Sequence, residues 1–563
     1  MSYDISIVGE GPAAAAAAAA FDDIDADVGD AEHPALTVVV VPAGAGIDHL
    51  DRDHGRLAVV EVGGVGGRAV ERLDAAVSVF GAEGARFGDL RMRVDATTDA
   101  DGSPSGDRSA VRFAGAVAGR RAVALLSGDP TVAGTVAEIA GTGVGAERQI
   151  LPVPTPESRD RTVPRGHRDV DVDDALTRAE RAFDERVGLV TQVGERESFP
   201  VPYYLAGTAD TRGFSDARAA EFAAGVDPDW DRAFMKALGE ALERYCAGVY
   251  RESAFPLASE RTRASPVPPS RFVRPSDAAT PDPDTPIRWV PGVDLATDEP
   301  VELPVAFVHY PPPTDEYGPP ITTGLGLGNS GTEALLSGLY EVVERDATML
   351  AWYSSFEPLE LECSDDGYED LVKRARAEEL SATTLLVTQD IDVPVVAAAV
   401  RRDAGWPRFA AGSAASLDPT DAARSALAEA LQNWMELRAM GPDAAETEEG
   451  AIGEYAADPT PAGGFFDVDA AVPAERVGPD DPPAGAAELD AVIDRVTDAE
   501  LDAYAARTTT RDVESLGFEA VRVVLPAAQP LFQGEPFFGD RVETVPPTLG
   551  FEPRPARAYH PFP

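Results

Sequence analysis

The 563-residue sequence has little positive charge, and lysine in particular is nearly absent. Lysine occurs only at positions 236 and 373, and 48 lysine and arginine residues face 97 aspartate and glutamate residues, giving a formal net charge of −49. Nucleic-acid binding depends on basic side chains that contact phosphates, so this balance argues against a nucleic-acid partner. Acidic charge spread over well-patterned segments is typical of adaptation to high salt, which screens carboxylate repulsion. We therefore expect a halophilic archaeon as the source.

Cysteine and long apolar runs are also scarce. Cys246 and Cys363 are too few for a disulfide framework or a cysteine zinc site, and the six histidines show no clustered pair. No segment reaches the length of a transmembrane helix. The alanine run at 13–20 lacks a basic flank and is surrounded by acidic residues, which excludes a signal peptide. The sequence thus predicts a cytoplasmic protein with no structural metal and no membrane partner.

The first 155 residues have the pattern of an α/β domain. A strand, a turn containing Gly9 and Gly11, an alanine-rich helix and a second strand open the chain in the manner of a Rossmann fold. Ala14 replaces the third glycine of the dinucleotide motif, so we favour a docking domain over a working nucleotide site. We expect strands at 4–8, 36–41, 57–62, 77–80 and 123–126, and a helix at 132–139.

A Pro-, Arg- and Asp-rich linker at 156–174 leads to a second domain at 175–563. We expect its first helix at 174–187. Residues 446–498 are acidic and rich in Pro, Gly and Ala, which predicts an exposed, partly disordered insertion. Further helices are expected at 227–250, from 332 onward and at 418–440, with strands near 289–295, 302–308, 385–387, 395–400 and 520–525.

Two of these helices repeat the sequence Glu-x-x-Glu-Arg. A single copy is most often a solvated helix face, but the second copy follows a glycine-rich loop at 324–331. If the two helices face each other, four carboxylates meet, and such a cluster persists only where cations neutralise it. Oxygen ligands of this kind suit Mg²⁺, and the arginines suit phosphate oxygens. The copies are Glu240, Glu243 and Arg244, and then Glu341, Glu344 and Arg345, with Asn329 and Glu333 just ahead of the second.

These residues resemble the motifs of the YcaO superfamily, whose pattern is Ser-x3-Glu-x2-Glu-Arg, Asn-x3-Glu and Glu-x2-Glu-Arg. Lys236 stands where the family has Ser, and residues 224–226 replace an upstream Gly-Lys-Gly. The resemblance implies a mixed α/β ATP-binding domain behind an E1-like domain, with ATP and Mg²⁺ as cofactors. It implies that Glu240, Glu243, Glu341 and Glu344 bind the metal. It also implies that nucleotide contacts come from Asn329, Glu333, Arg345, Arg244, Lys236 and Gln432, and that residues 409–416 form a small-residue turn near the phosphates.

The chain ends in a proline-rich segment. Such a segment is usually an extended, mobile tail. Azoline-forming YcaO enzymes, however, end in Pro-x-Pro-x-Pro, which enters the active site, and Pro561 and Pro563 match its last two prolines. Proline stiffens the backbone, so a terminal carboxylate is presented at little ordering cost and can act as a base. His560 is a second candidate for proton transfer.

The resemblance implies an ATP-dependent cyclodehydratase that acts on a ribosomal precursor peptide. A Cys, Ser or Thr of the substrate attacks the preceding amide carbonyl, the γ-phosphate of ATP captures the oxyanion, and loss of phosphate leaves a thiazoline or oxazoline. One alternative is a YcaO enzyme that installs thioamides; another is a noncatalytic scaffold that docks a peptide. We expect a homodimer, with an E1-like or leader-binding protein or a dehydrogenase as a candidate partner.

Overall fold

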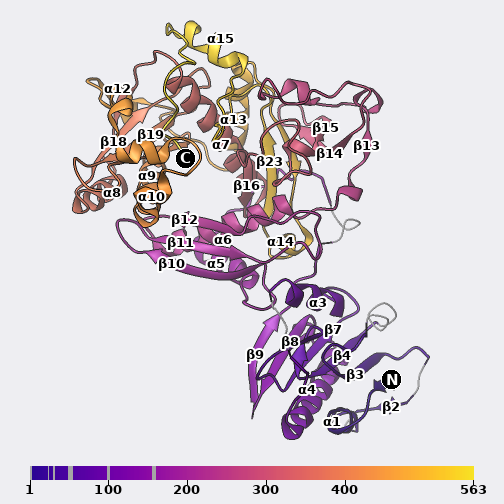
Figure 1. Cartoon of the computed structure of the whole chain (residues 1–563). Helices are drawn as coiled ribbons and strands as arrows, with labels where there is room; N and C mark the ends of the chain where they lie inside the picture. The colour runs from indigo at the N-terminus through magenta and orange to yellow at the C-terminus, as the bar shows by residue number, and fades with distance from the viewer. Residues whose placement is uncertain are drawn as a thin grey trace. The chain divides into compact units, whose positions relative to one another are not determined.

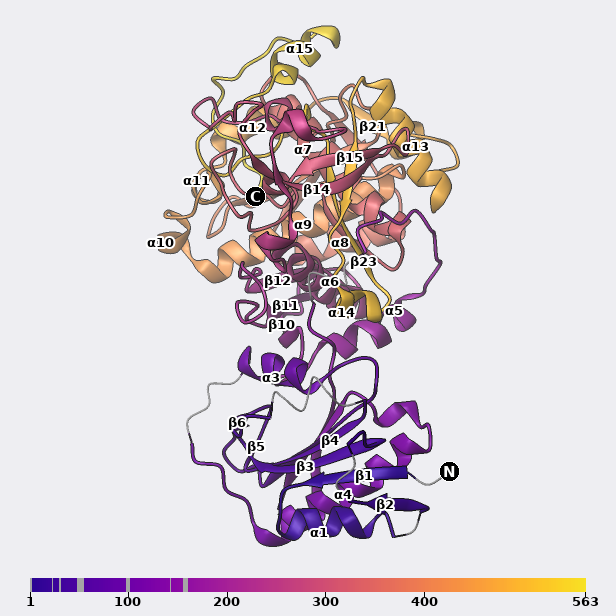
Figure 2. The ribbon, with the colours of Figure 1, turned by 90° about the vertical axis from the view of Figure 1, so that its right-hand side faces the viewer.

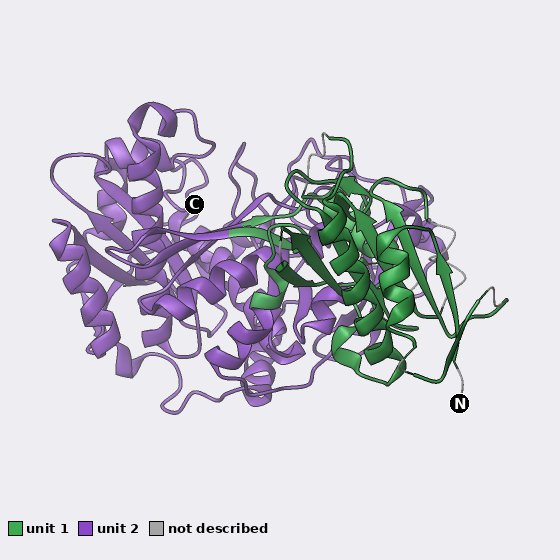
Figure 3. Ribbon diagram, turned by 90° about the horizontal axis from the view of Figure 1, so that it is seen from below, with its two compact units in different colours: residues 1–158, 180–192, 207–215 green, residues 159–179, 193–206, 216–563 purple. Residues whose placement is uncertain are grey.

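The computed structural model describes residues 3–22, 24–29, 32–47, 55–97, 102–141, 143–154 and 160–563 (Figure 1). The chain divides into two compact units, coloured separately in Figure 3. The first unit comprises 1–158, 180–192 and 207–215, and the second comprises 159–179, 193–206 and 216–563. The predicted mixed α/β class is confirmed. The expected boundary at 155 lies outside the described residues.

A seven-stranded sheet forms the centre of the first unit, in the order β2-β1-β3-β4-β7-β8-β9. Helices α1 (Pro12–Ala19) and α4 (Arg108–Leu126) cover one face, and α3 (Phe87–Asp95) covers the other (Figure 2). A Cβ at Gly115 would lie 2.1 Å from the Ala13 carbonyl oxygen, so glycine allows α1 and α4 to pack closely. The strands are β1 (Tyr3–Val8), β2 (Ala26–Val28), β3 (Leu36–Pro42), β4 (Leu57–Val62), β7 (Ala75–Phe80), β8 (Thr135–Ala140) and β9 (Gly143–Gln149), with a short hairpin of β5 (Gly64–Val65) and β6 (Arg68–Ala69).

Two predictions in this unit were wrong in type. Residues 123–126, expected as a strand, form the last turn of α4, and most of 132–139, expected as a helix, lies in β8. An apolar run of four residues does not distinguish a buried strand from the end of a buried helix. The helix expected at 174–187 is also shorter, because α5 (Val172–Ala179) gives way to a 3₁₀ turn at Glu180–Ala182.

The second unit is built around α7 (Gly331–Trp352), which packs against strands of two sheets. The six-stranded sheet has the order β13-β14-β22-β23-β16 with β15 on β14, and the five-stranded sheet has the order β20-β19-β18-β17-β21. A third sheet, β10-β11-β12, has most of its residues in this unit. The strands are β10 (Val190–Glu197), β11 (Tyr203–Thr208), β12 (Phe222–Val226), β13 (Leu257–Ala258), β14 (Ile287–Asp294), β15 (Pro300–Pro304), β16 (Leu325–Gly328), β17 (Leu359–Glu362), β18 (Ser381–Leu386), β19 (Val395–Arg401), β20 (Phe409–Ala415), β21 (Ala471–Pro473), β22 (Tyr504–Arg507) and β23 (Glu519–Val524).

The long helices of this unit begin at capped positions. Asp418 accepts hydrogen bonds from the backbone amides of Thr420 and Asp421, as expected for an N-cap. Asp229 and Ser330 cap the other two long helices in the same way. The helices are α6 (Trp230–Gly248), α8 (Asp366–Ala377), α9 (Pro419–Met440), α10 (Pro442–Ala445), α11 (Ile452–Ala457), α12 (Thr460–Phe466), α13 (Ala486–Asp498), α14 (Arg511–Ser515) and α15 (Asp540–Thr548).

Half of the glycine-rich segment at 324–331 is a strand, where a loop was expected. β16 pairs with β23, and its glycines lie directly against the backbone of α7. A Cβ at Gly326 would lie 2.2 Å from the Ala334 carbonyl oxygen, and one at Gly328 would lie 2.5 Å from the Ala334 nitrogen. The glycines therefore allow a strand and a helix to approach more closely than any side chain permits.

Residues 446–498 are not an exposed, disordered insertion. They contain α11, α12, β21 and α13, and Tyr455, Phe465 and Phe466 are buried in the core around α7. The Trp352 ring lies 5.2 Å from the Phe465 ring. The dense acidic surface lowers the mean hydropathy of this segment and conceals its apolar positions. Across the described ranges, every helix is too short or too polar to cross a bilayer.

Candidate active site

A cleft of about 1010 Å³ lies in the second unit, between α6, α7 and α9. Its lining includes residues from both Glu-x-x-Glu-Arg repeats, which therefore face one cavity as the sequence predicted. Of the predicted site residues, those that line it are Lys236, Glu240, Arg244, Glu341, Glu344, Arg345, Gln432 and Pro563.

The α6 repeat is held by its own arginine and by the neighbouring strand. Glu240 accepts a hydrogen bond of 2.9 Å from the Ala224 amide in the middle of β12, and Arg244 donates to its other oxygen at 3.1 Å. Glu243 lies behind the cleft lining. Burial, together with repulsion from nearby glutamates, raises the pKa of Glu243 to about 8, against the attraction of Arg244.

The α7 repeat is held by backbone and hydroxyl donors. Glu341 accepts a 2.9 Å hydrogen bond from the amide of Gly324, whose φ of 88° turns the chain into β16. Glu344 is buried and accepts a 2.7 Å hydrogen bond from the Ser413 hydroxyl. Burial raises the pKa of Glu344 to about 8, and the charge of Arg345 only partly offsets this. Glu344 therefore lacks enough nearby positive charge to stay fully ionised in the empty cleft.

Two residues outside the predicted set of ligands complete this arrangement. Ser413 lies on β20, not on the turn expected at 409–416, and Glu429 lies on α9. The Ser413 amide donates to Glu429 at 2.7 Å, and the Arg345 guanidinium lies 3.8 Å from the Glu429 carboxylate. The sequence held one signal for Glu429. It lies three residues before Gln432 on an amphipathic helix, and this spacing places both side chains on one face.

Two arginines, Arg345 in the cleft lining and Arg522 in the lining of a smaller neighbouring pocket, keep donor atoms without a hydrogen bond within the described residues. The Nη1 atom of Arg345 is buried and makes no hydrogen bond within the part of the chain that is described. Arg522 donates from Nη1 to the carbonyls of Ile321 and Thr322, and burial lowers its pKa to about 10. An anion entering the cleft would find a positive donor already in position at Arg345.

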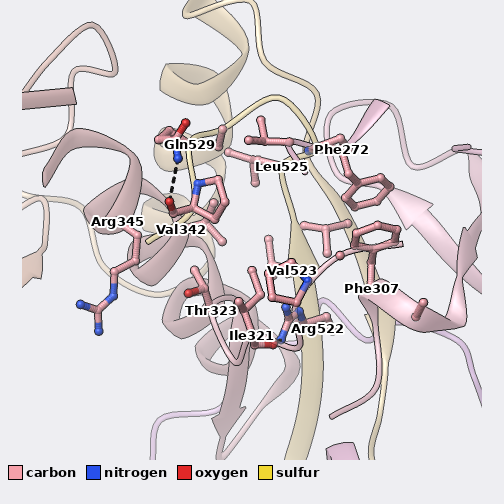
Figure 4. Close-up of a pocket in the computed structure, with 18 of the residues that line it drawn as sticks. Phe272, Phe307, Ile321, Thr323, Val342, Arg345, Arg522, Val523, Leu525 and Gln529 are labelled. Carbon is pink, nitrogen blue, oxygen red and sulfur yellow. Dashed lines mark hydrogen bonds between the residues drawn. The ribbon is translucent and has the colours of Figure 1, made fainter. Parts of the chain in front are cut away.

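A small apolar pocket of about 70 Å³ adjoins the cleft and shares part of its lining (Figure 4). The rings of Phe272 and Phe307 stack at 4.0 Å on one side. In Figure 4 the guanidinium of Arg345 points away from these rings. The apolar pocket and the charged cleft therefore adjoin at Arg345, which lines both.

Lys236 and Gln432 line the cleft but already have protein partners. The Lys236 ammonium lies 2.8 Å from the Asp227 carboxylate and donates to the Val226 carbonyl at 3.1 Å. Gln432 donates to Glu436 at 2.9 Å. A role for either side chain in nucleotide binding stays a prediction.

Asn329 and Glu333 lie away from the cleft lining. The Asn329 amide and backbone both donate to Glu333, at 3.3 and 2.9 Å. Arg178 donates to the Asn329 side-chain oxygen at 2.5 Å, and Arg168 donates to the Asn329 carbonyl. In this structure Asn329 is hydrogen-bonded to Arg168, ahead of α5, and to Arg178, within α5. The role of Asn329 and Glu333 as nucleotide ligands stays a prediction.

The proline-rich tail reaches the cleft. Pro561 and Phe562 are buried, and Pro563 lines both the cleft and a small apolar pocket beside it, which Pro561 also lines. His560 lies outside both linings, and its Nε2 atom is 2.7 Å from the Phe532 carbonyl oxygen. Burial lowers the pKa of His560 to about 4, so the ring is neutral at physiological pH.

A family model described as YcaO cyclodehydratase, ATP- and Mg²⁺-binding, matches residues 224–529, which is more than half of the sequence. The chain belongs to the YcaO family. ATP and Mg²⁺ are accordingly its cofactors, as the motifs predicted. The matched range holds both Glu-x-x-Glu-Arg repeats together with Ser413 and Glu429.

Solved structures show the same fold for this YcaO chain. A heterocyclase in complex with substrate and cofactor aligns with a TM-score of 0.74 and 18% identity, over 100% of this chain and 85% of that one. The heterocyclase TruD aligns with a TM-score of 0.68 and 18% identity, over 98% and 82%. YcaO from Methanopyrus kandleri, bound with AMPPCP and Mg²⁺, aligns with a TM-score of 0.51 and 23% identity, over 65% and 94%.

Curated sequence relatives share a shorter region. The chain is 33% identical over 152 residues to an uncharacterized protein of Methanothermobacter thermautotrophicus, covering 24% of this chain and 38% of that protein. It is 35% identical over 126 residues to an uncharacterized protein encoded in the tfuA 3′ region of Rhizobium leguminosarum bv. trifolii, covering 20% and 29%. The matched region thus spans about a third of each relative.

The cleft fits the cofactors of the YcaO family. No three His, Cys, Asp or Glu side chains form a ready-made metal site in the described ranges. Mg²⁺ is commonly held by only one or two carboxylates together with nucleotide phosphates and water, so a cluster of three protein ligands is not required. The buried Glu344 carboxyl would supply negative charge to the metal ion, and the free Nη1 donor of Arg345 would supply positive charge to a phosphate oxygen. The assignment of Glu240, Glu243, Glu341 and Glu344 as metal ligands stays a prediction.

Proposed function

We propose that this chain is an ATP- and Mg²⁺-dependent cyclodehydratase that forms thiazoline or oxazoline rings in a ribosomal precursor peptide. The observation that carries the proposal is that Pro563 lines the same cleft as Glu240, Glu344 and Arg345. The tail and the charged residues of both repeats therefore face one space, in which an activated amide and a base would meet. The fold shared with heterocyclase structures supports the same assignment.

The proposed roles of the side chains follow from their surroundings. Bound Mg²⁺ would neutralise phosphate charge and bring the buried glutamates to their ionised form. Ser413 would hold the Glu344 carboxylate in place by its 2.7 Å hydrogen bond. Arg345 would donate its free Nη1 to a phosphate oxygen, and Arg244 would keep Glu240 oriented. The nucleophile would come from the peptide, so the chain needs no nucleophilic residue of its own.

The tail would serve the reacting peptide. Burial of Pro561 and Phe562 fixes the segment, and the rings of proline limit its backbone freedom. Pro563 is thereby presented to the cleft at little further entropic cost. A carboxylate there would accept the proton of a substrate thiol or hydroxyl.

The first unit is proposed to dock the precursor peptide. Its glycine turn has Gly11 as the N-cap of α1 and Pro12 as the first helical residue, without a third glycine. The halophilic source, the cytoplasmic location, the homodimer and the partner proteins stay predictions.

The test uses purified protein in molar KCl with ATP, Mg²⁺ and a Cys-, Ser- and Thr-containing peptide encoded beside the gene. The expected result is ATP-dependent loss of one water per ring from the peptide, seen by mass spectrometry. A chain lacking residues 561–563 should bind ATP but not cyclise. Replacement of oxygen by sulfur that requires added sulfide would indicate the thioamide-forming alternative. Peptide binding with no ATP binding would leave the noncatalytic scaffold.

A further inference from the structure

The segment between β23 and α15 forms one wall of the cleft without helix or strand structure of its own. Leu531, Phe532, Gln533, Gly534 and Glu535 all line the cleft. Phe532 is buried, whereas the three residues after it are exposed. We call residues 531–535 the wall loop. Because no regular backbone ladder holds it, its position depends on contacts from elsewhere in the chain.

The proline-rich tail supplies two of these contacts at a single atom. The carbonyl oxygen of Phe532 lies 2.8 Å from the Tyr559 hydroxyl and 2.7 Å from Nε2 of His560. A carbonyl oxygen only accepts, and its two lone pairs serve two donors. His560 must therefore carry its proton on Nε2. The Tyr559 hydroxyl is also 3.0 Å from the Gly534 carbonyl, so it spans the wall loop.

Ring packing reinforces the same contact. The Phe532 ring lies 5.1 Å from the His560 ring, 5.4 Å from the Tyr559 ring and 5.9 Å from the Tyr353 ring. Tyr353 is the C-cap of α7, the helix that carries Glu341 and Glu344. The wall loop is thus clamped between the tail and the end of a helix that builds the cleft.

The tail is itself firmly held, so it can serve as an anchor. Tyr455 donates from its hydroxyl to the Tyr559 carbonyl at 2.6 Å, and Trp352 donates from its indole to the Ala558 carbonyl at 2.8 Å. The Arg557 guanidinium lies 4.0 Å from the centre of the Trp352 ring. Contacts from α7 and α11 therefore fix the tail before it reaches the wall loop.

We propose that Tyr559 and His560 are positioning residues, which hold the wall loop against the cleft by donating to the Phe532 carbonyl. His560 contributes an N–H donor and moves no proton. The tail then has two parts: residues 559–560 clamp the wall loop, and residues 561–563 lead into the cleft. The proposal rests on the proposed function in one respect, namely that the cleft binds ATP and the peptide.

The test compares four single variants of the full chain by limited chymotrypsin proteolysis of the wall loop and by ATPase kinetics. Tyr559→Phe and His560→Leu each remove a donor; loss of about one hydrogen bond should speed cleavage within residues 531–535 by roughly fivefold. Both should raise KM for ATP more than they lower kcat. His560→Gln keeps a donor nitrogen in the Nε2 position and should restore slow cleavage and a normal KM. Tyr3→Phe, which removes a 3.3 Å bond to the Leu126 carbonyl in the first unit, is the matched control.

Two results would overturn the proposal. If His560→Gln keeps slow cleavage yet is as inactive as His560→Leu, the imidazole takes part in the chemistry. If cleavage within residues 531–535 is unchanged in both Tyr559→Phe and His560→Leu, the tail does not hold the wall loop. Failure of the intact chain to bind ATP, with cleavage still responding to these variants, would refute the proposed function and leave the clamp standing.

Discussion

Replacing Ser413 with alanine should weaken binding of Mg²⁺ and ATP without unfolding the chain. The Ser413 hydroxyl donates at 2.7 Å to Glu344, and both side chains are buried. With the pKa of Glu344 raised to about 8, this carboxyl is largely protonated in the empty cleft at neutral pH, and metal binding must ionise it. The hydrogen bond is therefore strongest in the bound state. A hydrogen bond to a charged group contributes about 1.5–3 kcal/mol, so affinity should fall roughly tenfold to 150-fold.

The assay is isothermal titration of Mg²⁺-ATP into Ser413→Ala in molar KCl, where the charge of −49 is screened. Ser381→Ala is the matched control, because Ser381 lies in the same sheet and donates at 3.2 Å to the Arg401 carbonyl at the surface. That control should bind like the wild type. Equal affinity of Ser413→Ala and the wild type, with both chains folded, would refute the role assigned to this hydrogen bond.

Three further predictions follow from the same structure. Because burial raises the pKa of Glu243 and Glu344 to about 8, Mg²⁺ binding should release protons and tighten as pH rises to about 8; titration in buffers of different ionisation enthalpy measures this, and pH-independent affinity would contradict it. Gly326→Ala should lower the free energy of unfolding by about 1–3 kcal/mol, the usual cost of an extra group in a packed core, because its Cβ would lie 2.2 Å from the Ala334 carbonyl oxygen. Tm should fall with it, and an unchanged Tm would contradict this. The pKa of His560 falls from 6.5 in the unfolded chain to about 4 in the folded chain, so acid protonates the unfolded chain first. The free energy of unfolding should therefore be highest above pH 6.5 and should fall by up to about 3 kcal/mol as the pH drops through 4. Urea unfolding should show this loss in the wild type and not in His560→Gln; parallel curves would contradict it.

The strands of the first unit show where sequence patterning succeeds. A β-branched run bounded by turn residues identified Leu57–Val62 to the residue. Residues 123–126 look equally strand-like, but they end a helix whose buried face is built from small residues, such as Ala114, Ala118 and Gly115. Alanine and glycine on the buried face make the helical periodicity of hydrophobic residues hard to detect in the sequence. The helix is therefore recognised only from the packing of α1 against α4. The prediction for residues 446–498 was wrong for a related reason. Acidic surface residues dominate the composition of this segment, so its few buried apolar residues, such as Phe465, do not stand out.

Some residues of the candidate site could likewise be predicted from the sequence, and others could not. Spacing within a helix places Glu341, Glu344 and Arg345 together, because helical geometry is local. Ser413 and Glu429 reach the same carboxylate and guanidinium from a strand and a helix far along the chain, and no local pattern records that approach. The tail was recognised from its prolines, but the contact of His560 with a backbone carbonyl depends on the fold alone.

The central claim is that the cleft between α6 and α7 binds ATP with Mg²⁺. The most direct measurement is equilibrium binding of ATP in molar KCl, with and without Mg²⁺, to the intact chain and to Glu344→Gln, which keeps the size of the side chain and removes its charge. The account predicts Mg²⁺-dependent binding to the intact chain and a large loss of that dependence in the variant. Equal Mg²⁺-dependent binding by both proteins, or no binding by the intact chain, would contradict it.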